Sequence, residues 1–325
     1  MRWDELFEFK REPMRNGEIA VIAPQERVLV RVSGGDAAAF LQGQFCNDVD
    51  ALNPNGIQLN GYCTPKGRLL AVFHLMRDGA DFLMWFPTSE TDALLKRLRL
   101  FVMRADVTFD IEDTLTVVAL RGEALLSSAA LGSLTPTDTG EGIRAGGLRA
   151  YRLSDAVPST VLVGTQADLL AALSASDALS PHSSDWWHRT RMQAGEPILS
   201  GAASDRFVPQ MLNMDLIDGL SFSKGCYPGQ EIVARTRYLG KQKRRMLHYT
   251  GSGDGALIGP GDPLLTADGN AAGDMVSSVQ VDGTLTAIAV VRLEYRASTL
   301  HHASGIELFP ASLPYDPLEG TEYAG

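Results

Sequence analysis

Alternating apolar and polar positions predict β-strands through the first half of the chain. Val28, Val30 and Val32 fall on one side of an extended segment, which is the pattern of a half-buried strand. Similar apolar runs bounded by turn residues predict further strands over 57–62, 69–76, 82–87, 107–110, 114–120, 149–153 and 159–163. Residues 1–20 lack this pattern and are expected to form a weakly structured lead-in.

Helical periodicity interrupts these strands at several places. Apolar residues at 94, 95, 98 and 101 give the segment 90–101 the single apolar face of an amphipathic helix. Further helices are predicted over 37–41, 166–179 and 185–194. Because strands and helices do not alternate strictly, their order favours an α+β architecture over a doubly wound parallel sheet.

The pattern changes in the last quarter of the chain. Short strands separated by Gly and Pro are predicted over 245–250, 263–265, 275–281, 285–291 and 305–308. This spacing is typical of a small all-β barrel or sandwich, so residues 1–244 and 245–325 are predicted to be separate domains. The Ala-, Ser-, Thr- and Gly-rich stretch 122–147 is expected to be a linker-like excursion. The tail 310–325 is expected to be mobile.

Composition indicates an ordinary globular protein of two or three domains. The chain has 325 residues, of which 45% are hydrophobic and 21% charged. Its first ten residues are too charged for a signal peptide, and no apolar run approaches membrane-spanning length, so a cytoplasmic location is expected. Three cysteines without a paired spacing argue against a disulfide framework, a metal site or a self-contained iron–sulfur ligand set.

Charge is distributed unevenly along the sequence. Between Lys224 and Arg245 there are seven basic residues and one acidic residue, a net of +6, whereas the whole chain carries −10 and the remainder therefore −16. The overall charge argues against non-specific nucleic-acid binding. A basic island in an acidic protein suits an anionic ligand of limited size. Alternatively, about half of these charges complement a helix dipole at the surface.

The stretch Lys224-Gly-Cys-Tyr-Pro-Gly-Gln-Glu231 opens this basic island. Residues 227–230 have the composition of a tight turn. Gln230 and Glu231 would lie in the first turn of a following helix, which is predicted to end at Gly240. Cys226 thus precedes a helix N-terminus and is two residues from Lys224, and both features favour a reactive thiolate. The alternative is that Cys226 is a small buried hydrophobic residue.

The same stretch closely resembles the fingerprint of the YgfZ-type folate-binding proteins. Five further segments match that family in the expected order, and the resemblance runs from about Val28 to Arg245. These segments are 41–44 with Asn47 and Asp48, 64–68, 101–104 with Val107, 194–197 and 207–213.

The resemblance implies a fold, a cofactor and partners. The family is similar in fold to the glycine cleavage T-protein, an aminomethyltransferase, so we expect a three-lobed α+β arrangement with two intertwined lobes and a C-terminal β-barrel. The implied cofactor is tetrahydrofolate or a derivative. The implied function is assembly or repair of iron–sulfur enzymes, with indirect effects on tRNA modification. The implied partners are a reduced folate and iron–sulfur client or assembly proteins, without direct nucleic-acid or membrane contact.

One departure bears on the reaction. T-proteins carry an acidic pair after a glycine turn, whereas here the segment is Asp78-Gly-Ala-Asp-Phe-Leu83, which places Ala80 at the first acidic position. Asp81 remains, but a shift of one residue would turn it to the opposite face of a strand. A folate-dependent aminomethyl transferase is therefore kept only as an alternative. A second alternative is a non-catalytic tRNA-binding module, which the basic island alone supports.

Site residues follow from the resemblance and from the local chemistry. Cys226 is predicted to be the functional thiol, with Lys224 and Tyr227 beside it. Trp187 matches a folate-contacting tryptophan of the family, while Arg27 replaces another and could instead meet a glutamyl carboxylate. The other predicted cofactor-binding residues, each of which could be a structural turn or helix residue, are Gln44, Asn47, Gln210, Asn213, Gln230, Glu231, Arg235 and Arg237. Three groups are interpreted as structural or incidental. Lys66 and Arg68 are expected to form a solvated hairpin tip, with part of an anion site as the alternative; Cys46 and Cys63 are expected to be incidental; and His301 and His302 are expected to be exposed without metal spacing.

Overall fold

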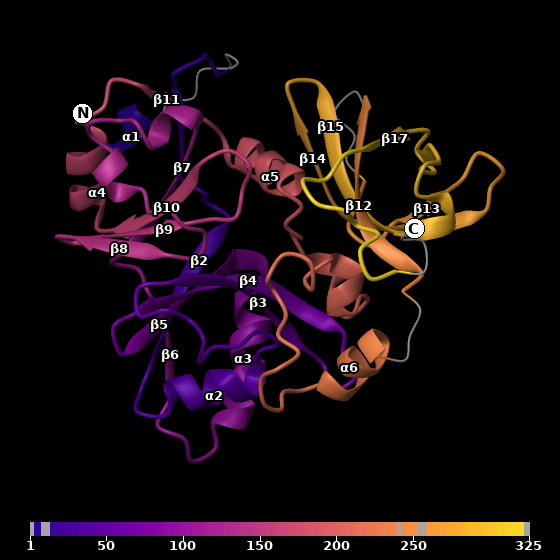
Figure 1. Ribbon diagram of the computed structural model, residues 1–325, viewed down its shortest axis with the longest axis horizontal. Helices are drawn as coiled ribbons and strands as arrows, with labels where there is room; N and C mark the ends of the chain where they lie inside the picture. Colours follow the sequence, from indigo (N-terminus) through magenta and orange to yellow (C-terminus); the bar gives the residue numbers. More distant parts are fainter. Residues whose placement is uncertain (1–2, 8–13, 239–241, 253–257, 322–325) are drawn as a thin grey trace.

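The computed structural model describes residues 3–7, 14–238, 242–252 and 258–321. Two open β-sheets and one closed barrel form three lobes, with the barrel at the right of Figure 1. The α+β prediction and the C-terminal barrel are confirmed. No helix in the described ranges is both long and apolar enough to cross a membrane.

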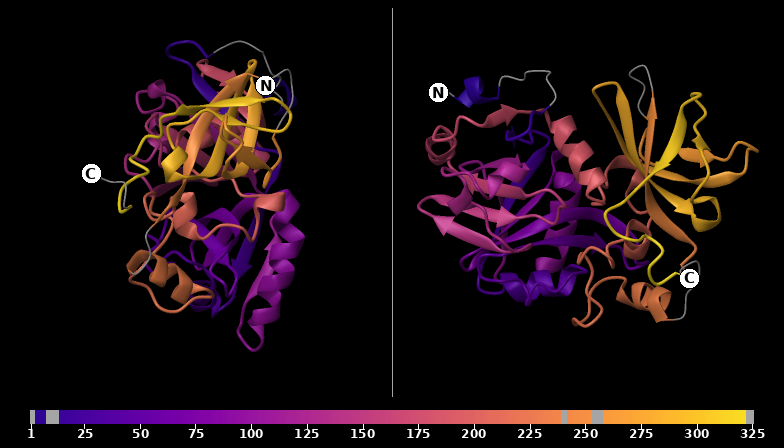
Figure 2. Two further views of the ribbon diagram at one scale, coloured as in Figure 1. Left: turned by 90° about the vertical axis from the view of Figure 1, so that its right-hand side faces the viewer. Right: turned by 45° about the horizontal axis from the view of Figure 1, so that its top comes forward.

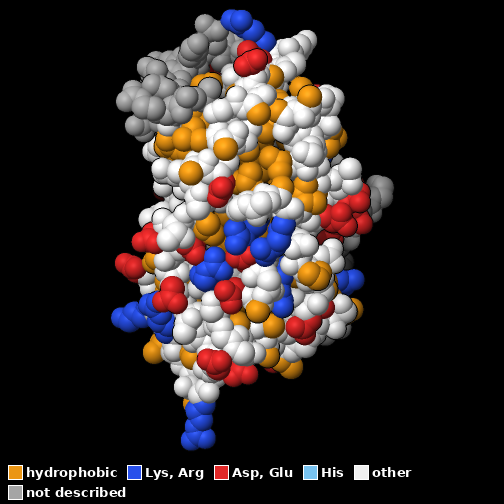
Figure 3. All heavy atoms as spheres, turned by 90° about the vertical axis from the view of Figure 1, so that its left-hand side faces the viewer, with side chains coloured by type: hydrophobic (Ala, Val, Ile, Leu, Met, Phe, Trp, Pro, Cys, Tyr) orange, Lys and Arg blue, Asp and Glu red, His pale blue; other side chains and the backbone are white. Residues whose placement is uncertain are grey.

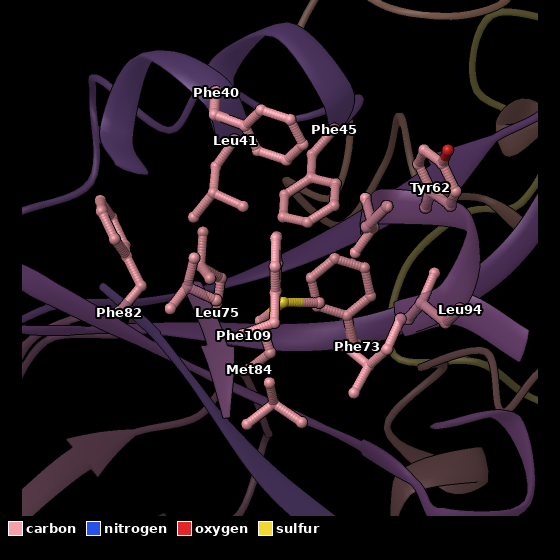
Figure 4. Close-up of a cluster of buried hydrophobic side chains, with 14 of the residues drawn as sticks. Phe40, Leu41, Phe45, Tyr62, Phe73, Leu75, Phe82, Met84, Leu94 and Phe109 are labelled. Carbon is pink, nitrogen blue, oxygen red and sulfur yellow. The ribbon is translucent and has the colours of Figure 1, made fainter. Parts of the chain in front are cut away.

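The first sheet is antiparallel and packs on both faces. In spatial order its strands are β3 (Ile57–Cys63), β4 (Leu69–Asp78), β5 (Asp81–Pro87), β2 (Arg27–Ser33) and β6 (Thr108–Ile111). Helices α2 (Ala37–Gln44) and α3 (Thr91–Val102) cover one face. Figure 4 shows the aromatic core beneath them. Phe82, Met84 and Phe86 of β5 enter this core, whereas Leu83 and Trp85 point to the other face. Burial on both faces explains why β5 reads as a continuous apolar run.

The second sheet packs against that other face. Its spatial order is β11 (Leu179–Pro181), β1 (Ile19–Ile22), β7 (Thr116–Arg121), β10 (Ser159–Gly164), β9 (Leu148–Arg152) and β8 (Gly142–Ala145). Helices α1 (Trp3–Leu6) and α4 (Gln166–Leu173) cover its outer side. The two sheets share a core that includes Trp85 and Trp187.

The barrel follows a long helical and loop segment. That segment holds α5 (Ser184–Gln193), α6 (Gln230–Tyr238) and the short 3₁₀ helices Gly201–Ala203 and Pro209–Leu212. The barrel closes in the order β12 (Arg244–Ser252), β15 (Thr284–Arg292), β14 (Ala271–Val281), β13 (Pro263–Leu265), β16 (Leu300–His301) and β17 (Glu307–Ala311). The remaining 3₁₀ turns are Thr88–Glu90, Glu123–Leu125, Gly132–Leu134 and Leu293–Tyr295. Figure 2 shows the barrel beside the two sheets.

Four local predictions were wrong, and each error has a physical reason. The predicted lead-in 1–20 runs into β1 (Ile19–Ile22), a fully buried strand that pairs with β7 and β11 and is too short to show alternation. The stretch 122–147 is packed rather than linker-like, because Leu125, Leu131 and Leu134 are buried. The helix predicted over 166–179 ends at Leu173, and the chain continues into β11.

The fourth error concerns the tail. Its Pro310 pairs with β12, and its Tyr315 makes hydrogen bonds to the body of the protein, so residues 310–321 are docked rather than mobile. The predicted helix stop at Gly240 lies outside the described residues.

Candidate functional site

A polar cavity lies where the two sheets meet α5 and the turn that follows it. Its volume is about 150 Å³, and its lining comes from β3, β4, β9, the loop 217–218 and the end of α5. The polar lining residues include Gln58, His74, Arg152, Arg191 and Glu196. A carboxylate, two guanidinium groups, an imidazole and an amide therefore line one small cavity that is partly open to solvent.

Glu196 is held in place by α5 and β4. Arg191 donates to its Oε2 from Nε at 3.0 Å and from Nη2 at 2.7 Å, and His74 Nε2 lies 3.5 Å from the same oxygen. Burial alone would raise the pKa of Glu196, but Arg191 and His74 hold it below the ordinary value. Within the described part of the chain these contacts all reach Oε2, which leaves Oε1 available to a ligand.

The other polar atoms around the cavity are incompletely satisfied. Burial lowers the pKa of His74 to about 4. The positive charges of Arg27 and Arg191 add to this lowering, whereas the negative charge of Glu196 opposes it. The imidazole is therefore neutral near pH 7. Among the described residues, His74 Nδ1, Arg152 Nη1 and Gln58 Oε1 are buried without a hydrogen-bond partner. Buried polar atoms normally have partners, so such a cluster suits a polar ligand.

Trp187 lies behind the cavity wall rather than in it. Its ring is 5.3 Å from the Arg191 guanidinium and 6.4 Å from the ring of Trp85. The Arg27 guanidinium stacks on Trp85, 4.4 Å from its ring, and donates to the Trp85 carbonyl oxygen at 2.7 Å. Arg27 also lines a second, more open cleft of about 690 Å³, together with His188 and barrel residues.

Three of the predicted loop residues position the backbone. Asn47 Nδ2 donates to the carbonyl oxygens of Leu59 and Asp218 at 2.8 and 2.7 Å, and both of these residues line the cavity. Gln210 donates to a carbonyl oxygen of α6, and Asn213 donates to one of the barrel. Gln44 is half-buried, and within the described ranges its Oε1 has no partner.

Lys224 fixes the loop that presents Cys226. Its Nζ donates to the carbonyl oxygens of Gln42, Phe45 and Asn47 at 2.6, 2.6 and 2.9 Å. Burial lowers the pKa of Lys224 to about 8, so the ammonium group keeps three hydrogens at neutral pH. Its ammonium lies 5.3 Å from the ring of Tyr227, which is also buried.

Cys226 itself is exposed, so its interpretation as a small buried hydrophobic residue is wrong, and its role as a functional thiol stays a prediction. The predicted turn is confirmed, because Gly229 has φ +83° and α6 starts at Gln230. A Cβ on Gly229 would lie 2.4 Å from the Thr64 carbonyl oxygen and 2.5 Å from Gly67 Cα. The hairpin 64–68 and the cysteine motif thus meet backbone to backbone.

The predicted site divides into two places. Gln230, Glu231, Arg235 and Arg237 belong to α6, beside the exposed thiol, and do not line the cavity. The cavity instead uses His74, Arg152, Arg191 and Glu196, which the prediction missed. A histidine inside the apolar run of β4 and the polar segment 194–197 were the available signals.

The acidic residues near the glycine turn are already paired. Asp78 accepts from Arg31 at 2.9 Å, from Arg149 at 2.6 Å and from Arg144. Burial by itself would raise the pKa of Asp78, but these arginines lower it to about 2. Asp81 binds Arg31 at 3.2 Å. Figure 3 shows basic and acidic side chains intermixed on the face that carries β8 and β9.

The sequence is similar to those of bacterial proteins named tRNA-modifying protein YgfZ. No protein-family model matches the chain. A protein of Colwellia psychrerythraea named tRNA-modifying protein YgfZ is 34% identical over 235 residues, which cover 70% of this chain and 71% of that protein. The protein of the same name from Cronobacter sakazakii is 27% identical over 318 residues, covering 91% of this chain and 94% of that one.

The fold is that of an aminomethyltransferase. The crystal structure of the glycine cleavage system aminomethyltransferase T from Bartonella henselae matches with a TM-score of 0.69, over 93% of this chain and 87% of that chain. At 16% identity this likeness concerns the fold alone. It agrees with the sheets and closed barrel described above.

Proposed function

This chain belongs to the YgfZ family, and from that membership we propose that it is a folate-binding accessory protein that depends on Cys226. In this proposal it assists the assembly or repair of iron–sulfur enzymes and affects tRNA modification indirectly, through such enzymes. The name of its relatives, tRNA-modifying protein, supports the link to tRNA modification. The central cavity, with its unpartnered buried polar atoms, is the observation that carries the folate part.

The donor and acceptor groups of the cavity fit a pterin ring. One edge of a pterin carries N–H groups, which can donate hydrogen bonds to Glu196 Oε1 and His74 Nδ1. The ring oxygen of the pterin can accept a hydrogen bond from Arg152 Nη1. A cavity of about 150 Å³ is smaller than the roughly 300–1,000 Å³ of typical ligand sites, so it would hold the ring alone. Arg27 stays a candidate for a glutamyl carboxylate. A bound reduced folate would supply a one-carbon carrier and a reductant.

The exposed thiol supports the second part of the proposal. Cys226 lies on a loop that Lys224 anchors and that Gly229 packs against the hairpin 64–68. An accessible thiol on a fixed loop can form a mixed disulfide or persulfide, or ligate a cluster held by a partner. The proposal does not require the thiol and the folate to touch.

Titration with tetrahydrofolate under anaerobic conditions tests the proposal, with tryptophan fluorescence as the signal. Saturable quenching is expected, because Trp85 and Trp187 pack against the residues of the cavity wall. Trp187→Ala should lose much of the signal. Cys226→Ser should bind folate like the wild type but fail to restore iron–sulfur enzyme activity in cells that lack the protein. Absence of saturable binding by the wild type would refute the folate part.

The two alternatives have weaker support. Aminomethyl transfer needs a free carboxylate, whereas Asp78 and Asp81 are both paired with arginine. Formation of methylenetetrahydrofolate from an aminomethyl donor would revive that alternative. Direct tRNA binding rests on the basic island, and Arg245 of that island is buried in a pair with Asp215. A salt-sensitive shift of tRNA by the purified protein would support it.

A further inference from the structure

Three segments form one continuous surface around Cys226. The hairpin 64–68 rests on α6, because a Cβ on Gly67 would lie 3.0 Å from the Cβ of Ile232. The loop before the motif is tied to the same helix by Arg237, whose guanidinium lies 3.9 Å from the ring of Phe222. We call this surface the thiol face. It comprises Lys66, Arg68, Cys226, Ile232, Arg235, Arg237 and Tyr238.

The basic side chains of the thiol face are not neutralised. In the described part of the chain, no carboxylate lies within salt-bridge range of Lys66, Arg68, Arg235 or Arg237. The arginines of other regions behave differently, since Arg31, Arg149, Arg191 and others each bind a carboxylate. Glu231 is the one acidic residue of α6. The thiol face therefore carries four basic side chains outside salt-bridge range of any described carboxylate, with Glu231 as the acidic residue of its helix, on a protein of net charge −10.

Apolar side chains are exposed between these charges. Ile232 is 39% exposed and Tyr238 is 68% exposed. An apolar centre within a charged rim is typical of a protein docking surface. Binding to an extended polyanion such as tRNA would rely on many phosphate contacts, which four unpaired cations on an acidic protein supply poorly.

We propose that the thiol face docks an acidic segment of a partner protein and brings a sulfur atom of that partner to Cys226. This inference rests on the proposed dependence on Cys226 and is independent of folate binding. Charge complementarity selects the partner and speeds encounter, while Ile232 and Tyr238 provide apolar contact. The chemistry at the centre is thiol–disulfide exchange with a disulfide that the segment presents. The Cys226 thiolate forms a bond to the near sulfur, the partner's S–S bond breaks, and the far sulfur leaves as a thiolate with the electron pair of that bond.

Model peptides test the proposal on the purified protein. Each peptide carries one cysteine activated as a mixed disulfide with thionitrobenzoate; one is rich in Asp and Glu, and its control has Lys at the same positions. The Cys226 thiolate attacks the peptide sulfur, the new disulfide forms, and the thionitrobenzoate thiolate leaves with the electron pair of the broken bond. No other oxidant is needed, and absorbance of the released thiolate gives the rate.

The acidic peptide should react about tenfold or more faster than the basic one at low salt, and the difference should shrink as salt is added. Arg235→Glu and Lys66→Glu should each lower the rate with the acidic peptide severalfold. The matched control is Arg104→Glu, on the loop after α3, because Figure 2 (left) shows α3 and α6 on opposite sides of the molecule. Cys226→Ser gives the blank, since Cys46 and Cys63 are buried.

Equal rates for the two peptides would overturn the proposal, as would an Arg104→Glu effect equal to that of Arg235→Glu. Salt-sensitive tRNA binding that Arg235→Glu abolishes, without peptide discrimination, would also overturn it and assign the face to RNA. Tetrahydrofolate titration of the same variants separates the two proposals. If the protein does not bind tetrahydrofolate but still prefers the acidic peptide, the folate proposal is refuted and the docking proposal stands.

Discussion

Tyr315 donates a hydrogen bond from its hydroxyl to the carbonyl oxygen of Gly195 at 2.8 Å. This contact joins the C-terminal tail to the turn that carries Glu196. Gly195 has φ +76°, and a Cβ there would lie 2.3 Å from the Tyr315 ring, so only glycine permits the approach. Asn213 donates to the same hydroxyl at 3.1 Å. The tail therefore holds one wall of the cavity in place.

Removing that hydroxyl should loosen the cavity. In Tyr315→Phe the Gly195 carbonyl loses its donor, which costs about 1 kcal/mol and should weaken reduced-folate binding roughly three- to tenfold. Fluorescence titration and thermal unfolding measure the two effects. Tyr295→Phe, a half-buried tyrosine of the barrel, is the matched control and should bind normally. Wild-type affinity in Tyr315→Phe would show that the tail does not shape the site.

Glu196→Gln removes the buried negative charge next to Arg191 and His74. The Arg191 guanidinium keeps its ion pair with Asp155 but loses its charged partner at Glu196, so we expect a loss of about 1 to 3 kcal/mol in unfolding free energy. Folate binding should fall strongly, because the carboxylate is the proposed acceptor for the pterin. Denaturant unfolding and titration test both expectations. Glu141→Gln, at an exposed position, should change neither.

Two glycines of the cysteine motif should respond differently to alanine. Gly229→Ala places a Cβ against Thr64 and Gly67 at positive φ, which should cost about 2 to 4 kcal/mol and detach the hairpin 64–68. Gly225→Ala meets nothing within 4 Å and should change stability by less than about 0.5 kcal/mol. Thermal unfolding of the two variants measures these stability changes. Equal losses of stability in Gly229→Ala and Gly225→Ala would mean that the contact with the hairpin is unimportant.

The local elements of the fold and the turn of the cysteine motif could be predicted from the sequence. The turn at Gly229 and the helix that starts at Gln230 follow from residues that specify their own backbone conformation. The amphipathic helix α3 and the short barrel strands also follow from local periodicity. These features depend on neighbours in sequence, which the chain displays directly.

Other features depend on neighbours in space. Arg191 and Glu196 meet His74 only because β4 packs beside the end of α5, and no sequence pattern gives that distance. Tyr315 reads as part of a Pro-rich tail until its contact with Gly195 is known. The predicted cofactor residues of α6 were grouped with the cavity because they adjoin the motif in sequence, whereas the helix faces solvent.

Lys224→Met should release the loop that carries Cys226. Three carbonyl oxygens, those of Gln42, Phe45 and Asn47, would lose their shared charged donor, at a cost of about 2 to 4 kcal/mol. Limited proteolysis should then cut within 221–229 faster, and thermal stability should fall. Lys66→Met, an exposed lysine on the neighbouring hairpin, is the control and should leave both unchanged. An unaltered Lys224→Met protein would contradict the anchoring role.

The buried imidazole of His74 should make stability depend on pH. Its pKa is about 4 in the folded protein and the ordinary value is 6.5, so between these values the unfolded chain binds a proton that the folded chain does not. Stability should therefore fall as the pH drops from about 6.5 to about 4, by at most about 1.4 kcal/mol per pH unit for this group.

His74→Asn removes that titration, so its unfolding free energy should decline less steeply over the same window. Glu196, whose pKa is also lowered, acts at lower pH: its contribution is lost only as the pH falls through its depressed value. Lowered pKa values for His182, His188 and His248 leave a residual slope in the variant. Denaturant unfolding at a series of pH values measures the difference, and identical slopes for His74→Asn and the wild type would mean that His74 is already protonated in the folded state.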